Sequence, residues 1–273
     1  MTTPGIALDD LRHDHGPVRV ELHGPDDAIA LVTLHRPEVA NALDDETMAV
    51  LADLWTRAAA CRELRCIVIT GAGKAFCSGA DASMLSAERT VLGDTAAAEM
   101  RFVAGTRVGV PVITLVNGAC AGGGLHFVAD ADICIASTAA WFTDPHVSVG
   151  QVSALEPLLL RLRMRSDALT RLALLGRAER LDAERAEQVG LVSEVVAPAD
   201  LLARGLELAT AISQASPEAV RLTRRALRTF EDRLLETHLD LGWELIRRHR
   251  AHPDATEGPR AFLERRSPHW ATD

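Results

Sequence analysis

The sequence lacks a surplus of positive charge. Its 29 lysines and arginines face 38 aspartates and glutamates, which leaves a formal net charge of −9. Such a chain repels nucleic-acid phosphates and anionic membrane surfaces unless it carries a local basic patch. We therefore expect neither nucleic acid nor a membrane among its partners. Lys74 is the only lysine, and we attribute this bias to composition rather than to function.

The sequence also lacks long apolar runs and paired cysteine motifs. No stretch approaches the 18 uninterrupted apolar residues of a membrane-spanning helix, and no secretory signal opens the chain. The five cysteines form no C-x-x-C pair and lie scattered in apolar surroundings, which is typical of reduced core residues in a reducing compartment. These absences together predict a cytoplasmic protein.

Hydrophobic residues, by contrast, are plentiful. They make up 48% of 273 residues, enough to bury the core of one large domain. From residue 18 to 137, short apolar runs alternate with helical periods, which predicts a β/α repeat with a largely parallel sheet. Strands are expected at Val18–Leu22, Ala28–Leu34, Cys66–Thr70, Pro111–Val116 and Asp132–Ala136, and helices at Asp44–Cys61, Thr95–Val108 and Leu125–Ala131.

The C-terminal part is predicted to be mostly helical. After about residue 153 only Leu191–Val196 has the pattern of a strand. Helical periods cover Leu155–Leu175, Ala183–Gln188, Leu201–Gln214, Pro217–Arg228, Glu231–Arg250 and Thr256–Arg265. The last helices carry leucine stripes among arginines, which favours packing against a neighbouring subunit over an ordinary amphipathic cover.

Three segments have patterns that suit chemistry. Arg36–Asp44 follows a predicted strand and precedes a helix. Gly73–Asp81 follows another strand and is rich in small residues, which let a ligand come close to the backbone. Asn117–Gly118 is followed by the glycine run of Ala121–His126 at a helix start, where free amides and the helix dipole favour negative charge.

The three segments, in this order and spacing, resemble the crotonase superfamily of enoyl-CoA hydratases and isomerases. The resemblance covers nearly the whole chain and ends at Glu257–Arg266, whose E-G-P-R-A-F-L-E-R-R is similar to a closing segment of that family. It implies an α/β fold, the crotonase (ClpP-like) spiral of β-β-α units with a mostly helical C-terminal region. We expect a flexible arm at 1–16, the core at 17–200, and at 201–273 a helical region for oligomerisation and active-site cover.

The resemblance also implies a site. The backbone amides of Ala80 and Gly123 would form an oxyanion hole for the thioester oxygen of an acyl-CoA substrate. Coenzyme A would enter as part of the substrate, with no separate cofactor and no metal site. The family's assembly implies a homo-trimer or a hexamer. The residues expected along coenzyme A are Ala40, Ala42, Ser78, Ala80 and Asp81.

The sequence departs from the family at both positions where a hydratase carries a catalytic glutamate. Three residues after Gly123 stands His126, and the family's F-G-x-P-E segment is matched by F-T-D-P-H, which ends in His146. A neutral and a protonated imidazole could divide the work of base and acid, since histidine titrates near neutrality. A helix N-terminus disfavours positive charge, so His126 is the candidate base and His146 the candidate acid or water-orienting group.

Two carboxylates nearby have open roles. Glu156 falls in a window where some family members place a catalytic acid, but it also opens a helix, where the dipole favours an acidic residue for structural reasons. Asp144 is either a site carboxylate or a turn residue, and we favour the turn residue.

Several functions stay open. Hydration of a 2-enoyl-CoA is the leading hypothesis, with isomerisation beside it. Some relatives resemble hydrolases of a C–C bond in a cyclic β-diketone and use a histidine near the position of His146, but they pair it with an aspartate where this chain has Leu155 and Glu156. A catalytically impaired acyl-CoA binder is a third alternative. RNA binding occurs in a few relatives, and the negative charge argues against it here.

Overall fold

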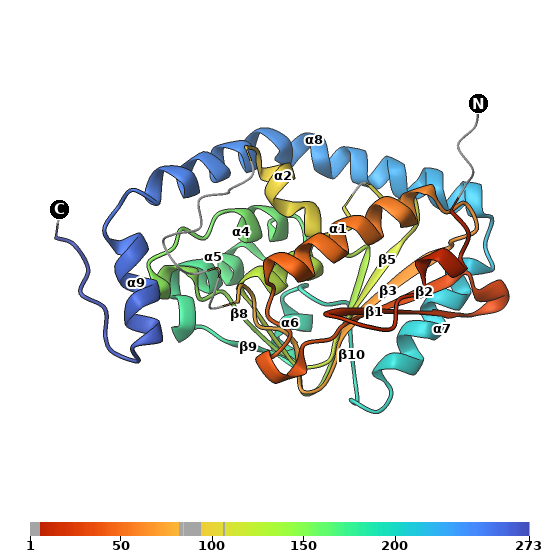
Figure 1. Ribbon diagram of the computed structural model, residues 1–273, viewed down its shortest axis with the longest axis horizontal. Helices are drawn as coiled ribbons and strands as arrows, with labels where there is room; N and C mark the ends of the chain where they lie inside the picture. Colours follow the sequence, from red (N-terminus) through yellow and green to blue (C-terminus); the bar gives the residue numbers. More distant parts are fainter. Residues whose placement is uncertain (1–5, 82–83, 85–93, 106, 273) are drawn as a thin grey trace.

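Two sheets and a helical C-terminal region make up the fold. The computed structural model describes residues 6–81, 84, 94–105 and 107–272 (Figure 1). The larger sheet has six strands in the order β1 (Val18–His23), β2 (Ile29–Leu34), β3 (Cys66–Gly71), β5 (Val112–Val116), β7 (Ile133–Ser137) and β10 (Glu194–Val196). Its first pair is antiparallel and every later pair is parallel. The predicted, largely parallel sheet is thus confirmed.

A second, smaller sheet was not predicted from the sequence. It contains β4 (Ala75–Cys77), β6 (Ala119–Ala121), β8 (Trp141–Thr143) and β9 (Leu181–Asp182). The first three of these are parallel, and β9 pairs with β8 in the antiparallel sense. The chain runs from a strand of the large sheet into a strand of the small one and returns through helical segments. That path is the spiral of β-β-α units that the resemblance implied.

Helices enclose both sheets. Their bounds are α1 (Asp45–Ala60), α2 (Ala96–Glu99), α3 (Leu125–Asp130), α4 (Leu155–Leu160), α5 (Ser166–Leu175), α6 (Ala183–Gln188), α7 (Leu201–Ser213), α8 (Pro217–His249) and α9 (Asp254–Leu263). α1 begins where the Asp44 carboxylate accepts the Thr47 N–H at 2.8 Å, a regular N-cap. Its buried Trp55 donates the indole N–H to the carbonyl of Phe102 at 2.8 Å, so the helix is tied to the segment after α2.

The helical predictions were wrong in three places. Of Thr95–Val108, only α2 is α-helical, and a short 3-10 turn follows it. Leu155–Leu175 is divided into α4 and α5. The two helices expected at Pro217–Arg228 and Glu231–Arg250 form the single long α8, which runs along one side of the molecule (Figure 1).

A buried arginine and a partly buried one attach α8 to the core. Arg224 and Arg228 each bind the carboxylate of Asp132, at 2.7 and 3.0 Å, and Arg224 also donates to the carbonyl of Val108 at 2.6 Å. These charge-assisted bonds hold the first half of α8 against the end of α3. Among the described residues, no helix is both long enough and apolar enough to cross a bilayer.

The N-terminal segment is described only in part. Of the expected arm, residues 1–5 lie outside the described residues. Residues 6–16 contain a 3-10 turn at Asp9–Leu11, and the Leu11 side chain is buried in the main core.

Candidate active site

Two backbone amides from separate segments lie next to each other. The segment after β4 pairs with Leu43, which donates to the carbonyl of Gly79 and accepts from the N–H of Asp81, both at 2.8 Å. In such a parallel bridge the N–H of Ala80 points away from Leu43. A Cβ atom at Gly123, in the 3-10 turn before α3, would lie 3.8 Å from the nitrogen of Ala80. Within the described turns and loops, neither Ala80 nor Gly123 donates its N–H to another group of the chain.

The parallel pairing of two short strands creates this neighbourhood. β4 and β6 pair through Cys77 and Cys120, so the segments that follow them emerge side by side. Gly79 has a φ of +93°, and a Cβ there would lie 2.8 Å from the carbonyl oxygen of Ala121. Only glycine permits so close an approach of two backbones. Two unpaired N–H groups placed in this way can stabilise negative charge on one oxygen atom.

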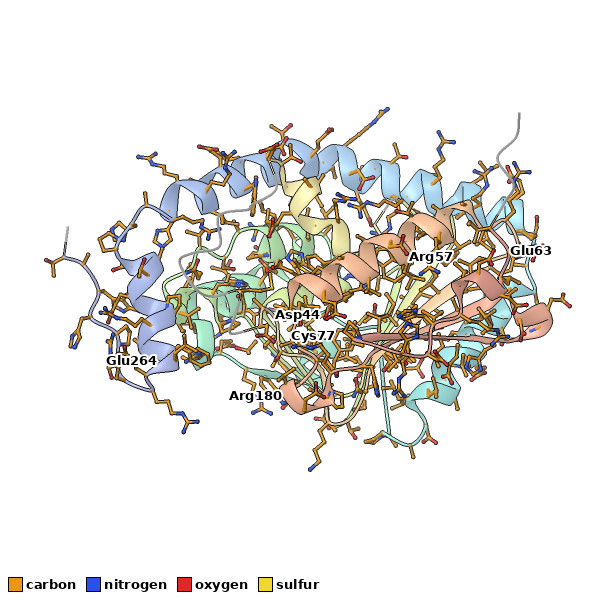
Figure 2. All side chains as sticks on the ribbon, in the orientation of Figure 1. Asp44, Arg57, Glu63, Cys77, Arg180 and Glu264 are labelled. Carbon is orange, nitrogen blue, oxygen red and sulfur yellow. The ribbon has the colours of Figure 1, made fainter. Side chains whose placement is uncertain are left out.

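Cys77, in β4, is fully buried in the interior (Figure 2). Burial raises the pKa of its thiol to about 12. The thiol therefore stays protonated at neutral pH, and a nucleophilic role, which needs the thiolate, is disfavoured.

A cavity of about 230 Å³ unites the amides with the candidate side chains. Its wall includes Ala80, Gly123, His126, His146 and Glu156. The rest of the wall is largely apolar and includes Leu43, Met48, Phe102, Leu155, Trp243 and Ile246. Ala80 and Glu156, which are 76 positions apart in the sequence, thus line the same cavity.

The Glu156 carboxylate lies between the two histidines. Its Oε1 atom is 3.1 Å from Nε2 of His126 and 3.6 Å from Nε2 of His146. His126 and Glu156 are both buried, while a quarter of the His146 side chain is exposed. The Nδ1 atom of His126 is buried without a hydrogen-bond partner among the described residues. If Nε2–H of His126 donates to Glu156, the tautomer leaves a free lone pair on Nδ1, as a base requires.

The surrounding charges favour a protonated His146 and an ionised Glu156. Burial opposes a charge on His146, but the Glu156 charge and the Asp144 hydrogen bond outweigh it and raise the pKa of His146 to about 9. Burial likewise opposes a charge on Glu156, yet the two histidines lower its pKa well below the ordinary value. At neutral pH the pair is therefore an imidazolium beside a carboxylate.

Asp144 is more than the turn residue that the sequence suggested. Its carboxylate is almost fully buried and lies 2.5 Å from Nδ1 of His146, and it accepts the Ser153 hydroxyl at 2.5 Å. Neither contact could be predicted from the sequence, because an aspartate between a strand and a proline is usually an exposed turn residue. Its neighbour in the chain, His146, was the only hint.

The residues expected along coenzyme A also come together. Ala40, in the left-handed region with a φ of +54°, accepts the Ser78 N–H at 3.1 Å. The Arg36 guanidinium donates to the carbonyl of Ala42 at 2.7 Å and to the carboxylate of Asp81 at 3.0 Å. Hydrogen bonds thus join the first two predicted segments to each other on either side of Ala80.

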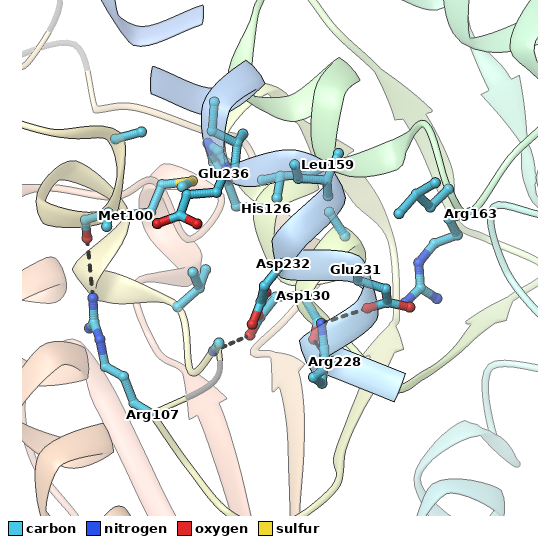
Figure 3. Close-up of a pocket in the computed structure, with 18 of the residues that line it drawn as sticks. Met100, Arg107, His126, Asp130, Leu159, Arg163, Arg228, Glu231, Asp232 and Glu236 are labelled. Atoms are coloured by element: carbon cyan, nitrogen blue, oxygen red, sulfur yellow. Dashed lines mark hydrogen bonds and ion pairs between the residues drawn. The ribbon is translucent and has the colours of Figure 1, made fainter. Parts of the chain in front are cut away.

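A second cavity, of about 640 Å³, is lined by residues of α3 and α8 (Figure 3). It shares Met100 and His126 with the first cavity. Its far wall is acidic, with Asp130 and Asp232 close together beside Arg228, which pairs with Glu231 (Figure 3). Burial is the main cause that raises the pKa of Asp130 and of Asp232.

The structure defines an α/β protein with two adjacent backbone amides at a cavity, and comparison with known proteins gives its family. The model of the enoyl-CoA hydratase/isomerase family matches residues 24–273, so the chain belongs to this family. It is 35% identical to mevalonyl-coenzyme A hydratase of Aspergillus fumigatus over 265 residues, which covers 90% of this chain and 92% of that protein. It is 34% identical to (E)-benzylidenesuccinyl-CoA hydratase of Thauera aromatica over 245 residues, 88% of this chain and 94% of that one.

Solved structures support the same relationship. A crystal structure of an enoyl-CoA hydratase/isomerase from Pseudoalteromonas atlantica T6c superposes with a TM-score of 0.84 at 29% identity, and covers 94% of this chain and all of that chain. A carnitinyl-CoA dehydratase from Mycobacterium avium 104 gives a TM-score of 0.83 at 29% identity, with coverage of 95% and 100%. The crotonase fold is thus shown, and the protein is an enzyme of this family.

Proposed function

We propose that the protein adds water to the double bond of a 2-enoyl-CoA thioester. The thioester oxygen would accept the N–H groups of Ala80 and Gly123, which stabilise the enolate formed when water adds at the β carbon. The removal of one such donor typically costs about 3 kcal/mol of transition-state stabilisation. Coenzyme A would lie along Ala40, Ala42, Ser78 and Asp81, which lead to the amide of Ala80.

The two histidines would act where a typical hydratase has two glutamates. His126, whose side chain lines the cavity, would take a proton from the attacking water. His146, held as the imidazolium between Asp144 and Glu156, would deliver a proton to the α carbon. Glu156 would orient both rings and balance the charge. One observation carries the proposal. A single cavity of 230 Å³ is lined by Ala80, Gly123, His126, His146 and Glu156.

A spectrophotometric assay tests the proposal. Hydration removes the conjugated enoyl chromophore, so a series of 2-enoyl-CoA thioesters of increasing chain length is followed by loss of ultraviolet absorbance. We expect turnover, and a fall in kcat of about 100-fold or more in His126→Gln and in His146→Gln, the range of general acid–base effects. His15→Gln, on an exposed side chain, is the matched control and should keep full activity.

The same reagents separate the alternatives. Movement of a double bond without net water uptake, detected by mass spectrometry in labelled water, would favour an isomerase. Cleavage of a cyclic β-diketone would favour the C–C bond hydrolase. Tight acyl-CoA binding by calorimetry without any turnover would favour a non-catalytic binder, and either of these last two results would overturn the hydratase proposal.

We also propose that the protein assembles as a homo-trimer or hexamer through its C-terminal helices. α8 exposes a row of large apolar side chains, which a second copy would cover: Leu222, Leu227, Phe230, Leu234, Leu241 and Leu245. Light scattering behind a sizing column tests this directly, with Phe230→Glu as the variant. A monomer at micromolar concentration in the unmodified protein would contradict it.

A further inference from the structure

We propose that Asp144 and Ser153 are positioning residues that hold His146 in its acid form and tie it to the segment that carries Glu156. The inference rests on the hydratase function proposed above and adds two residues to it. The two oxygen atoms of the Asp144 carboxylate bind two different segments of the chain.

The first oxygen of Asp144 serves His146. Oδ1 lies 2.5 Å from Nδ1 of His146 and also accepts the backbone N–H of His146 at 3.3 Å. Because a carboxylate can only accept, Nδ1 must carry a proton, and Nε2 is the ring atom left to face Glu156. Asp144 follows β8 directly, and β8 is held between β6 and β9, so the carboxylate has a fixed base.

The second oxygen of Asp144 serves a different segment. Oδ2 accepts the hydroxyl of Ser153 at 2.5 Å. Ser153 lies just before α4, the helix that presents Glu156 in its first turn. One buried carboxylate therefore joins the segment of His146 to the segment of Glu156, the residue whose charge balances that of His146.

Asp144 has His146 as its one ion-pair partner among the described residues. A buried carboxylate without a cation is costly, so its charge and that of His146 support each other. Three other titratable or charged groups surround His146. Glu156 from α4 lies next to it, and His126 from α3 lies on the other side of the Glu156 carboxylate. Arg250, which follows the last residue of α8, lines the same cavity. From α9, the Glu257 carboxylate is bound by Arg260 and Arg266.

The segment of His146 offers a matched control. Ser148 belongs to the same 3-10 turn, His146–Val149, but its hydroxyl oxygen accepts the N–H of Arg177 at 2.9 Å and does not contact Asp144. Ser148→Ala removes a hydroxyl from the same turn, so it shows how far the loss of a structural hydrogen bond alone changes the titration of His146. Ser153→Thr keeps a hydroxyl at the positioning site and serves as the conservative variant.

Two measurements on the full-length protein test the inference. Nitrogen-15 NMR of the labelled imidazoles, assigned with His146→Gln, follows the titration of His146 without any substrate. In Asp144→Asn we expect the His146 titration to move down by at least one pH unit, and in Ser153→Ala by less. Ser148→Ala and Ser153→Thr should titrate like the unmodified protein.

The second measurement is the pH profile of enoyl-CoA hydration. Asp144→Asn should lower kcat at pH 8 by tenfold or more, with KM within about twofold, and should move the alkaline limb to lower pH. An unchanged His146 titration in a folded Asp144→Asn variant would overturn the inference. If no enoyl-CoA is turned over at all, the proposed function fails, while the NMR titration still decides whether Asp144 positions His146.

Discussion

A Cβ atom at Gly79 would lie 3.1 Å from the amide nitrogen of Gly123, which is tighter than nine in ten natural Cβ contacts. Gly79 belongs to the segment after β4, and Gly123 to the turn before α3. The two candidate oxyanion donors can therefore be close only because position 79 has no side chain. This relationship makes the site open to a precise test by substitution.

Gly79→Ala should lower kcat by about 100-fold or more, because the added methyl group pushes the Gly123 amide away from that of Ala80. The matched control is Gly73→Ala in the same loop. Gly73 also has a positive φ, of +74°, but a Cβ there would meet only the side chain of Pro37. Equal loss of activity in both variants would indicate loop strain rather than displacement of an amide. Steady-state kinetics on the folded variants separates the two.

Glu156→Gln should reduce kcat by at least tenfold and shift the alkaline limb of the activity profile to lower pH. The amide keeps the shape of the carboxylate but removes the charge that raises the pKa of His146. His146 then loses its proton at a lower pH. The measurement is the pH dependence of kcat in both proteins, with Glu179→Gln, whose carboxylate pairs with Arg171, as the control. Identical pH profiles would show that Glu156 does not set the charge of His146.

Stability should fall as the pH rises from 6.5 to about 9. The pKa of His146 is raised from 6.5 to about 9 in the folded state, so the folded protein binds this proton more tightly than the unfolded chain. The resulting stabilisation is fully present below pH 6.5 and is lost as the pH rises through the folded value. It amounts to about 3 kcal/mol at most. Urea unfolding at a series of pH values should show the decline, and His146→Gln should flatten it.

Glu156 should act with the opposite sign at low pH. Its folded pKa is lowered, so it contributes stability above its ordinary value of 4.5, and this contribution is lost as the pH falls further. Urea unfolding between pH 5 and 3 should therefore show a steeper loss in the unmodified protein than in Glu156→Gln. A parallel decline in the two proteins would contradict the ion pair.

Asn41→Ala should destabilise the protein by about 2–3 kcal/mol. The Asn41 amide donates to the carbonyls of Ala72 and Ala75, at 2.9 and 2.8 Å, and its oxygen accepts the N–H of Arg36 at 2.9 Å. Its φ of +54° is also a conformation that asparagine tolerates better than alanine. Thermal unfolding measures the effect, and a loss below about 0.5 kcal/mol would show that these bonds are not needed.

The sequence predicted the large sheet well because β1 alternates apolar and polar residues and β2, β3, β5 and β7 are largely apolar runs. It missed the small sheet because β4, β6 and β8 have three residues each, too few for any periodicity to be recognised. It divided α8 at Arg228, although neither glycine nor proline occurs there to end a helix. The long helix follows from its anchoring to Asp132, a contact that no local pattern contains.

The candidate site, like the fold, could be predicted from the sequence only in part. The glycines beside Ala80 and Gly123 carry a local signal, since they mark places where backbones must come close. The approach of Glu156 to both histidines depends on how α3, α4 and the turn after β8 pack, and sequence spacing alone does not fix it. Asp144 was interpreted as a turn residue because burial of a side chain next to a proline cannot be inferred from its neighbours.

A crystal structure with acetoacetyl-CoA tests the central claim most directly. We predict that the thioester oxygen lies about 3 Å from the amide nitrogens of both Ala80 and Gly123, with the acyl carbons facing His126 and His146. A thioester oxygen bound elsewhere in the cavity, or by only one of these two nitrogens, would contradict the account.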